Sequence, residues 1–319
     1  MFARVLRLRS NVIGRYSSNY CQAGSESWLR SYQRRGAARF FSVKSPQCLQ
    51  EAKVQDEAHH SSSSPSPPEG LKAFGDIVIS RKAAYSFSDK EIDLSILRDI
   101  MALTQSSPSS FNIQPWSVVL VRDAAARERL STTMLGGNAK KVLAAPVTAV
   151  FCADLEPSKR IHRMVELSRQ AGMAEADITK LSLAVNLFGG EGLVGNAVRN
   201  AVTSIASPMQ PAPEVASAEA WSFKNTALAV QTYILSCTAH GLDTAPMEGF
   251  DARRVRATLD IPDRYGIPMV VCTGYPAPSK TGDKGAGGRS ARRWRYPPQE
   301  VVFDGSFGVG MAGVDPVVP

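Results

Sequence analysis

The chain has 319 residues, of which 44% are hydrophobic, enough for one large domain or two small ones. Its formal net charge is +8. Residues 1–45 carry nine Lys and Arg against one acid, which leaves 28 bases and 28 acids in the rest. Charge confined to one end argues against a nucleic-acid-binding surface. No apolar run reaches 18 residues, so no membrane span is expected.

The first 41 residues have the composition of a mitochondrial transit peptide. They are rich in Arg, contain Ser, nearly lack acids and begin with an amphipathic stretch. Arg39-Phe40-Phe41-Ser42 resembles a matrix-protease site with cleavage after Phe41. We therefore expect residues 1–41 to direct a soluble protein to the mitochondrial matrix. A disordered basic tail and a plastid signal are the alternatives.

Beyond this segment the pattern of apolar residues predicts one globular domain. Residues 42–70 are rich in Ser and Pro and predict a disordered linker, and the domain spans residues 71–304, followed by a C-terminal tail at 305–319. Within the domain we expect helices at 71–81, 123–134 and 218–240 and across much of 155–207. A further helix is expected to open at the capping box Ser88–Glu91 and to continue through Ile100. Strands are expected at 117–121, 147–152 and 267–272. Strands separated by helices predict a layered α+β domain.

Two features that could suggest a metal, disulfide or dinucleotide site are explained without one. The five Cys residues are scattered without a C-x-x-C pair, which predicts reduced, partly buried thiols rather than disulfides or a zinc site. No other metal site is expected. Residues 190–195 read G-x-G-x-x-G, but they follow a helical run at 178–187 instead of a strand. We therefore expect a turn between helices there and no dinucleotide site.

The segment from Ser107 to Trp116 reads S-P-S-S-F-N-I-Q-P-W and predicts an ordered polar loop. Its two Pro residues fix φ near each end, and its Ser and Asn side chains offer hydrogen-bonding groups at close spacing. The segment resembles the active-site loop of the FMN-dependent nitroreductase family. That resemblance implies that the loop reaches across a dimer interface to the flavin, with Pro108, Ser109, Ser110 and Asn112 at the cofactor.

Further segments resemble the family's motifs in the same order along the chain. The resemblance implies that Arg81 and Lys82 bind the phosphate and ribityl oxygens, and that Asn138 and Lys141 contact the flavin edge, with Lys141 at N1 and O2. It also places the backbone of Glu248 and Gly249 at N5, and Arg293 and Arg295 over the phosphate. Ala83 departs from the family's Ser, and Tyr85 replaces a cation near the pyrimidine edge.

The resemblance implies a nitroreductase-like α/β/α fold, with a central, mostly antiparallel sheet flanked by helices, in an intertwined homodimer. It further implies an oxidoreductase in which NADH or NADPH reduces FMN by a ping-pong scheme, with nitroaromatics and quinones as acceptors. No catalytic side chain is expected, because the cofactor carries the chemistry. Two alternatives remain: a same-fold dehalogenase or flavin-cleaving enzyme, determined by the lid at 155–220, and a non-catalytic flavin-binding homologue, suggested by Ala83 and Tyr85.

Overall fold

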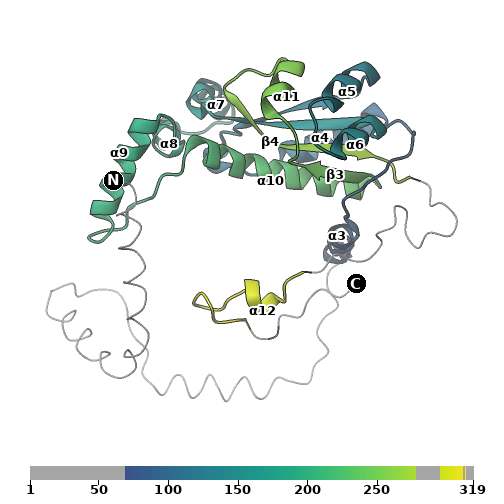
Figure 1. Ribbon diagram of the computed structural model, residues 1–319. Helices are drawn as coiled ribbons and strands as arrows, with labels where there is room; N and C mark the ends of the chain where they lie inside the picture. The colour runs from purple at the N-terminus through teal and green to yellow at the C-terminus, as the bar shows by residue number, and fades with distance from the viewer. Residues whose placement is uncertain (1–68, 278–294, 312, 314–319) are drawn as a thin grey trace, which may run out of the picture. The chain divides into compact units, whose positions relative to one another are not determined.

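The computed structural model describes residues 69–277, 295–311 and 313 (Figure 1). The predicted transit peptide, nearly all of the predicted linker and Arg293 lie outside these residues. No helix in the described part of the chain combines the length and hydropathy needed to cross a bilayer.

The centre of the domain is a four-stranded sheet in the order β1-β2-β4-β3. Each neighbouring pair of strands is antiparallel. The strands are β1 (Trp116–Val121), β2 (Val147–Asp154), β3 (Asp243–Met247) and β4 (Tyr265–Gly274). The two longest strands therefore lie in the middle, and β1 and β3 form the two edges.

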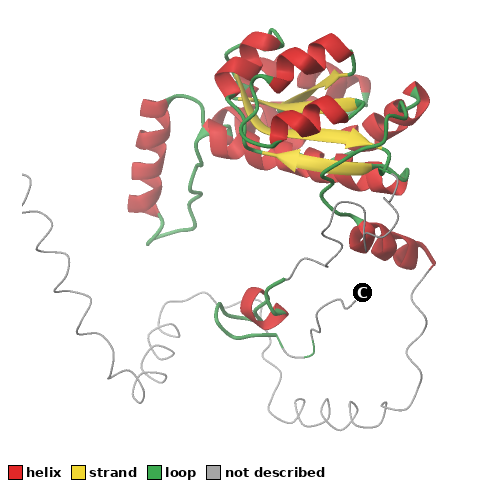
Figure 2. Cartoon of the chain, turned by 45° about the vertical axis from the view of Figure 1, so that its right-hand side comes forward, coloured by secondary structure: helices red, strands yellow, loops and turns green. Residues whose placement is uncertain are grey.

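Both faces of this sheet are covered by helices (Figure 2). All eight residues of β2 are buried. Along β2 the side chains alternate between two apolar clusters: Val150 and Cys152 belong to one, and Ala149 and Phe151 to the other. This period of two is expected of a strand, and burial on both sides explains why the sequence of β2 reads as a continuous apolar run.

Two helices pack on the face that contains Phe151, namely α4 (Leu94–Gln105) and α10 (Ala218–Ala239). The Tyr233 ring of α10 meets the Phe151 ring edge-on at 5.4 Å, and its hydroxyl lies 2.8 Å from Thr273 Oγ1. The opposite face is covered by α5 (Ala124–Ser131), α6 (Asn138–Ala144) and α11 (Ala252–Thr258) (Figure 1). The expected α+β layering is confirmed.

A helical segment, residues 155–217, connects β2 to α10. It contains the 3₁₀ helix η2 (Pro157–Arg160), α7 (Ile161–Gln170), α8 (Glu175–Phe188) and α9 (Leu193–Ala206). Residues 190–192 of the G-x-G-x-x-G motif lie in the turn between α8 and α9, as predicted, and its last three residues begin α9. There the Glu191 carboxylate accepts hydrogen bonds from the Ser158 backbone N–H (2.5 Å) and hydroxyl (2.7 Å), so the turn holds η2 in place.

The predicted thiols are buried where the structure describes them. Cys152, Cys237 and Cys272 are free and buried, and burial raises the pKa of each thiol to about 12. A thiol with such a pKa is not a nucleophile near neutral pH. These three residues therefore serve the core.

The structure differs from the predicted secondary structure in two places. The sheet has a fourth strand, β3, which the pattern did not reveal because it is a five-residue edge strand containing Pro246. The helix expected to open at Ser88 begins at Leu94 instead. Its N-cap is Asp93, whose carboxylate accepts the Ser95 N–H at 2.8 Å. The helices at α3 (Glu69–Ser80), α5 and α10 match their predicted positions, while α6, α11 and the short α12 (Pro298–Val301) were not assigned.

Mutation can distinguish the observed N-cap of α4, Asp93, from the predicted one, Ser88. The hydrogen bond from the Ser95 N–H is the main cause that lowers the pKa of Asp93. A carboxyl with a lowered folded-state pKa stabilises the fold above its unfolded pKa of about 4, and this effect is lost as the pH falls through the folded value. We expect Asp93→Ala to lower the Tm at pH 7 more than Ser88→Ala, with the Asp93 effect shrinking toward about pH 2.5. Thermal melts between these pH values measure this, and an effect of Asp93→Ala that does not change with pH would contradict it.

Candidate functional site

The polar loop predicted before β1 adopts a strained backbone. Phe111, Asn112 and Gln114 have φ values of 56°, 52° and 48°. In this left-handed region a residue with a Cβ carries a cost of about 1–2 kcal/mol. Three such residues within four positions persist only if the surroundings hold them, and strain of this kind clusters at functional sites.

Three side chains hold the loop in this conformation. Ser109 Oγ accepts the Gln114 N–H at 2.9 Å within the loop. From α10, Asn225 Oδ1 accepts the Ser110 N–H at 2.7 Å, and from η2 the Arg160 guanidinium donates to the Gln114 carbonyl at 2.8 Å. Asn225 is 1% exposed, and its amide nitrogen donates to the Trp221 carbonyl, which fixes the orientation of the amide. Asn225 was not among the residues predicted from the sequence, although a polar residue inside an apolar helix is an available signal.

The second group of predicted residues gathers beside edge strand β3. Ala83 pairs with Thr244 in a parallel bridge, and the Ala84 N–H donates to the Thr244 carbonyl at 2.8 Å. Lys82 Nζ lies 3.7 Å from the Asp243 carboxylate. Burial raises the pKa of Asp243, and the neighbouring Lys82 opposes that shift. Asp243 and Thr244 are therefore contacts of the 81–85 segment that the sequence did not indicate.

A chain of contacts joins this segment to α6 and to the end of β3. Lys141 Nζ donates to Asn138 Oδ1 at 3.1 Å, and Asn138 Nδ2 donates to the Gly249 carbonyl at 3.1 Å. The Lys141 ammonium also lies 5.2 Å from the centre of the Tyr85 ring, within the range of a cation–π interaction. These contacts bring together, from three distant parts of the sequence, a set that we call the Lys141 group: Lys141, Asn138, Gly249 and Tyr85.

A side chain at Gly249 would fit only if the Asn138 amide moved away. A Cβ atom there would lie 2.8 Å from Asn138 Nδ2. The Gly249 carbonyl also accepts the Leu135 N–H at 3.0 Å, so the backbone is held close to the turn before α6. Glycine is therefore required for the Asn138 amide to reach this strand end.

The two groups lie at opposite corners of the sheet within one chain. Thr244, which pairs with Ala83, is aligned through Thr273 with Val147 at the start of β2, and Trp116, at the exit of the loop, is aligned with Ala153. Six residues along a strand span roughly 20 Å, and crossing from β1 to β3 adds roughly 14 Å sideways. One chain therefore does not bring the loop to the Ala83 bridge, and Gly249 lies beyond β3, at the edge of the sheet away from the loop.

The other predicted residues lie at or near the surface where the structure describes them. Glu248 and Pro108 are exposed, and Arg81 is half-buried directly after α3. Arg295 is exposed shortly before α12, and Arg293 lies outside the described residues.

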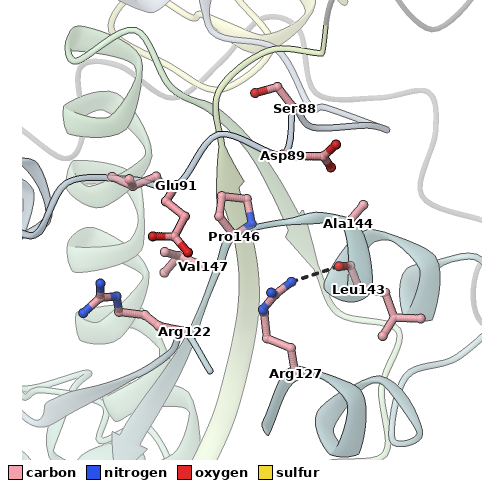
Figure 3. A pocket seen from close by; sticks show the side chains of 10 residues that line it. Ser88, Asp89, Glu91, Arg122, Arg127, Leu143, Ala144, Pro146 and Val147 are labelled. Carbon is pink, nitrogen blue, oxygen red and sulfur yellow. Dashed lines mark hydrogen bonds between the residues drawn. The ribbon is translucent and has the colours of Figure 1, made fainter. Parts of the chain in front are cut away.

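A cavity of about 270 Å³ lies near the start of β2 and contains none of these residues (Figure 3). It is lined in part by Asp89, Glu91, Arg122 and Arg127, so its charges are of both signs. The Arg127 guanidinium donates to the Leu143 and Ala145 carbonyls at 2.9 and 2.7 Å. Arg127 therefore caps the C-terminal end of α6 and supports the helix that carries Asn138 and Lys141.

The chain is similar to several known proteins in sequence and in structure. An NADH dehydrogenase of Thermus thermophilus is 28% identical over 200 residues, covering 62% of this chain and 84% of that protein. The crystal structure of a nitroreductase family protein from Streptococcus pneumoniae superposes with a TM-score of 0.55 at 20% identity, covering 72% of this chain and 99% of that one. A protein from Exiguobacterium sibiricum, crystallised in complex with FMN, has a TM-score of 0.51 at 16% identity, covering 73% and 96%.

The model of the nitroreductase family matches residues 78–275. This range contains the polar loop, the Lys141 group and all four strands. The expected fold, an open antiparallel sheet flanked by helices, is confirmed by the structural relatives. The match covers more than half of this chain, and the chain therefore belongs to the nitroreductase family.

Proposed function

We propose that this protein is an FMN-dependent oxidoreductase that takes a hydride from NADH or NADPH and passes it to nitroaromatic and quinone acceptors. The contact chain of Lys141, Asn138 and Gly249 is the observation that carries the proposal. The FMN complex of the Exiguobacterium sibiricum relative and the NADH dehydrogenase activity named for the Thermus thermophilus relative support it.

The residues beside β3 suit the chemistry of FMN. A phosphate dianion requires cationic groups, which Arg81 and Lys82 supply. The isoalloxazine ring is planar with polar edges, and Asn138 and Lys141 offer an amide and an ammonium on one helix face. Gly249 leaves space where a Cβ would otherwise meet Asn138. When bound, FMN would supply the two-electron hydride chemistry that no side chain provides.

Lys141 would stabilise negative charge at the cofactor's pyrimidine edge. Its ammonium is held by Asn138 at 3.1 Å and by the Tyr85 ring at 5.2 Å. Tyr85, the position where the family carries a cation, thus supports the remaining cation through its ring face. This arrangement favours a working reductase over the non-catalytic alternative.

We propose further that the active enzyme is a homodimer. The polar loop and the Ala83 bridge lie at opposite corners of one sheet, and the Lys141 group lies beside the edge away from the loop, so we propose that a second copy brings Ser109, Ser110 and Asn112 to the Lys141 group of the first. Apolar side chains on α3, α4 and α10 support a subunit contact, because Phe74, Val78, Leu103 and Leu228 are 43–53% exposed. Donor and acceptor would use the same shared pocket in turn, which is a ping-pong scheme.

We also propose that the protein acts in the mitochondrial matrix, on the basis of the N-terminal composition. Quinones are the acceptors that best suit that compartment.

An anaerobic absorbance spectrum of the purified protein, reconstituted with FMN, tests the function. We expect a flavin spectrum that bleaches on addition of NADH or NADPH and returns on addition of a quinone or nitroaromatic. A flavin spectrum that neither donor changes would instead support the binding-only alternative. Failure to retain FMN would refute both.

Substitution of Lys141 tests its electrostatic role. Lys141→Gln keeps a donor to Asn138 but removes the charge. A charge-assisted hydrogen bond contributes about 1.5–3 kcal/mol, which for a two-electron couple corresponds to a fall in midpoint potential of roughly 30–60 mV. The neighbouring, exposed Lys140 is the matched control, and Lys140→Gln is expected to shift the potential by less than about 10 mV, because solvent and salt screen it. Redox titration of the FMN-loaded variants measures both, and equal shifts would contradict the role of Lys141.

The close approach at Gly249 gives a separate test. Gly249→Ala displaces the Asn138 amide, whose end can move at little cost to folding, so we expect a Tm near that of the wild type. The FMN dissociation constant is expected to rise about tenfold or more, equivalent to about 1.4 kcal/mol. Gly137→Ala is the control, because a Cβ there meets nothing within 4 Å. Fluorescence titration with FMN compares them, and unchanged affinity in Gly249→Ala would remove this residue from the proposed site.

A further inference from the structure

A buried carboxylate lies beneath the polar loop. Asp154, the last residue of β2, is fully buried. It accepts hydrogen bonds from Arg160 Nε at 2.7 Å and from the Glu156 N–H at 3.1 Å, and Arg264 Nη2 lies 3.2 Å away. A buried charge is tolerated only when it is paired in this way, so the two guanidinium groups are held firmly in place.

Of the two arginines, only Arg160 reaches the loop. Its Nη1 donates to the Gln114 carbonyl at 2.8 Å, and its Nη2 donates to Ser117 Oγ at 3.1 Å and to the Tyr265 hydroxyl at 3.4 Å. The planar fork thus connects the end of β2, the exit of the loop and β4. Arg264 shares the same carboxylate, and its guanidinium also contacts Tyr265, which lies outside the loop.

The bond to Gln114 falls where the loop is strained. Gln114 has a φ of 48°, and its N–H is the group that closes the loop onto Ser109 Oγ. The Gln114 carbonyl also accepts the Trp116 N–H at 2.7 Å, so loss of the Arg160 fork removes one of two hydrogen bonds to this carbonyl and one of the contacts that offset the cost of the left-handed conformation. The conformation of Ser109, Ser110 and Asn112 therefore depends on the position of the Arg160 guanidinium.

Arg160 is also the last residue of η2, where the α7–α9 segment begins. One side chain thus joins the loop to the helical segment that connects β2 to α10.

We propose that Asp154 and Arg160 are positioning residues that preset the polar loop for the cofactor site of a second copy. The pair acts through the loop backbone and does not touch the cofactor. The functional part of this proposal rests on the FMN-dependent activity proposed above, whereas the effect on the loop does not.

The test compares two substitutions on the same carboxylate. Arg160→Lys keeps the charge beside Asp154 but loses the fork that also reaches Gln114. Arg264→Lys is the matched control, because it changes the other partner of Asp154 and no bond to the loop. Hydrogen exchange of the peptide 107–116 is measured first in FMN-free protein, since the Ser110 and Gln114 amides report the loop directly.

We expect exchange of this peptide to be at least tenfold faster in Arg160→Lys and within twofold of the wild type in Arg264→Lys. In FMN-loaded protein, anaerobic stopped flow should show flavin reduction by NADH at least tenfold slower in Arg160→Lys only. Ser117→Ala, which removes one acceptor of Arg160 and keeps both charges, should accelerate exchange about two- to fivefold. It replaces Arg160→Lys if that variant does not fold.

Equal exchange in the Arg160 and Arg264 variants would overturn the proposal. Faster exchange with an unchanged rate of flavin reduction would overturn its functional part. A wild-type protein that does not bind FMN would instead refute the proposed function, and the exchange comparison would still decide whether the pair presets the loop.

Discussion

Burial of β2 on both faces is the constraint on which the rest of the structure depends. All eight of its residues are buried, and neighbouring positions face different clusters, one closed by α4 and α10 and the other by α5, α6 and α11. A strand in this position cannot slip by one residue without exchanging the side chains of its two faces. The register of β1 and β4 against β2 is therefore fixed, and with it the position of each segment attached to the strand ends.

The candidate site follows from that register. The polar loop enters the sheet at the end of β1 that is aligned with Ala153, whereas the Ala83 bridge lies at the opposite end and the opposite edge. At the first corner, Asp154 terminates β2 with a buried charge and holds the loop through Arg160. Near the second, α6 presents Asn138 and Lys141 to Gly249. The two corners are complementary in chemistry, and this is why we propose that a second copy completes the site.

The two corners differ in how they are held. The loop is strained and is held by hydrogen bonds from buried or half-buried groups, Asn225 and Arg160 among them. The Lys141 group is half-buried and relies on one glycine, one amide and one aromatic ring. Rigid presentation on one side and a single oriented cation on the other suit a protein whose chemistry belongs to a cofactor, because binding and electrostatics are then the protein's whole contribution.

The sequence by itself determined the layered α+β class, the long helix at 218–240, most strands and the motifs that identify the family, because apolar periodicity and turn residues act locally. It also predicted that Asn138, Lys141 and Gly249 belong together, through resemblance. Only the tertiary structure decided that α4 begins after Asp93 and that a short strand containing Pro246 forms the second edge of the sheet. The roles of Asn225, Asp154 and Arg160 also emerged only there, since the side-chain bonds of Asn225 and Arg160 to the loop join residues 115 and 46 positions apart. Such contacts leave no local pattern, because they depend on which strand ends and helix faces the fold brings together.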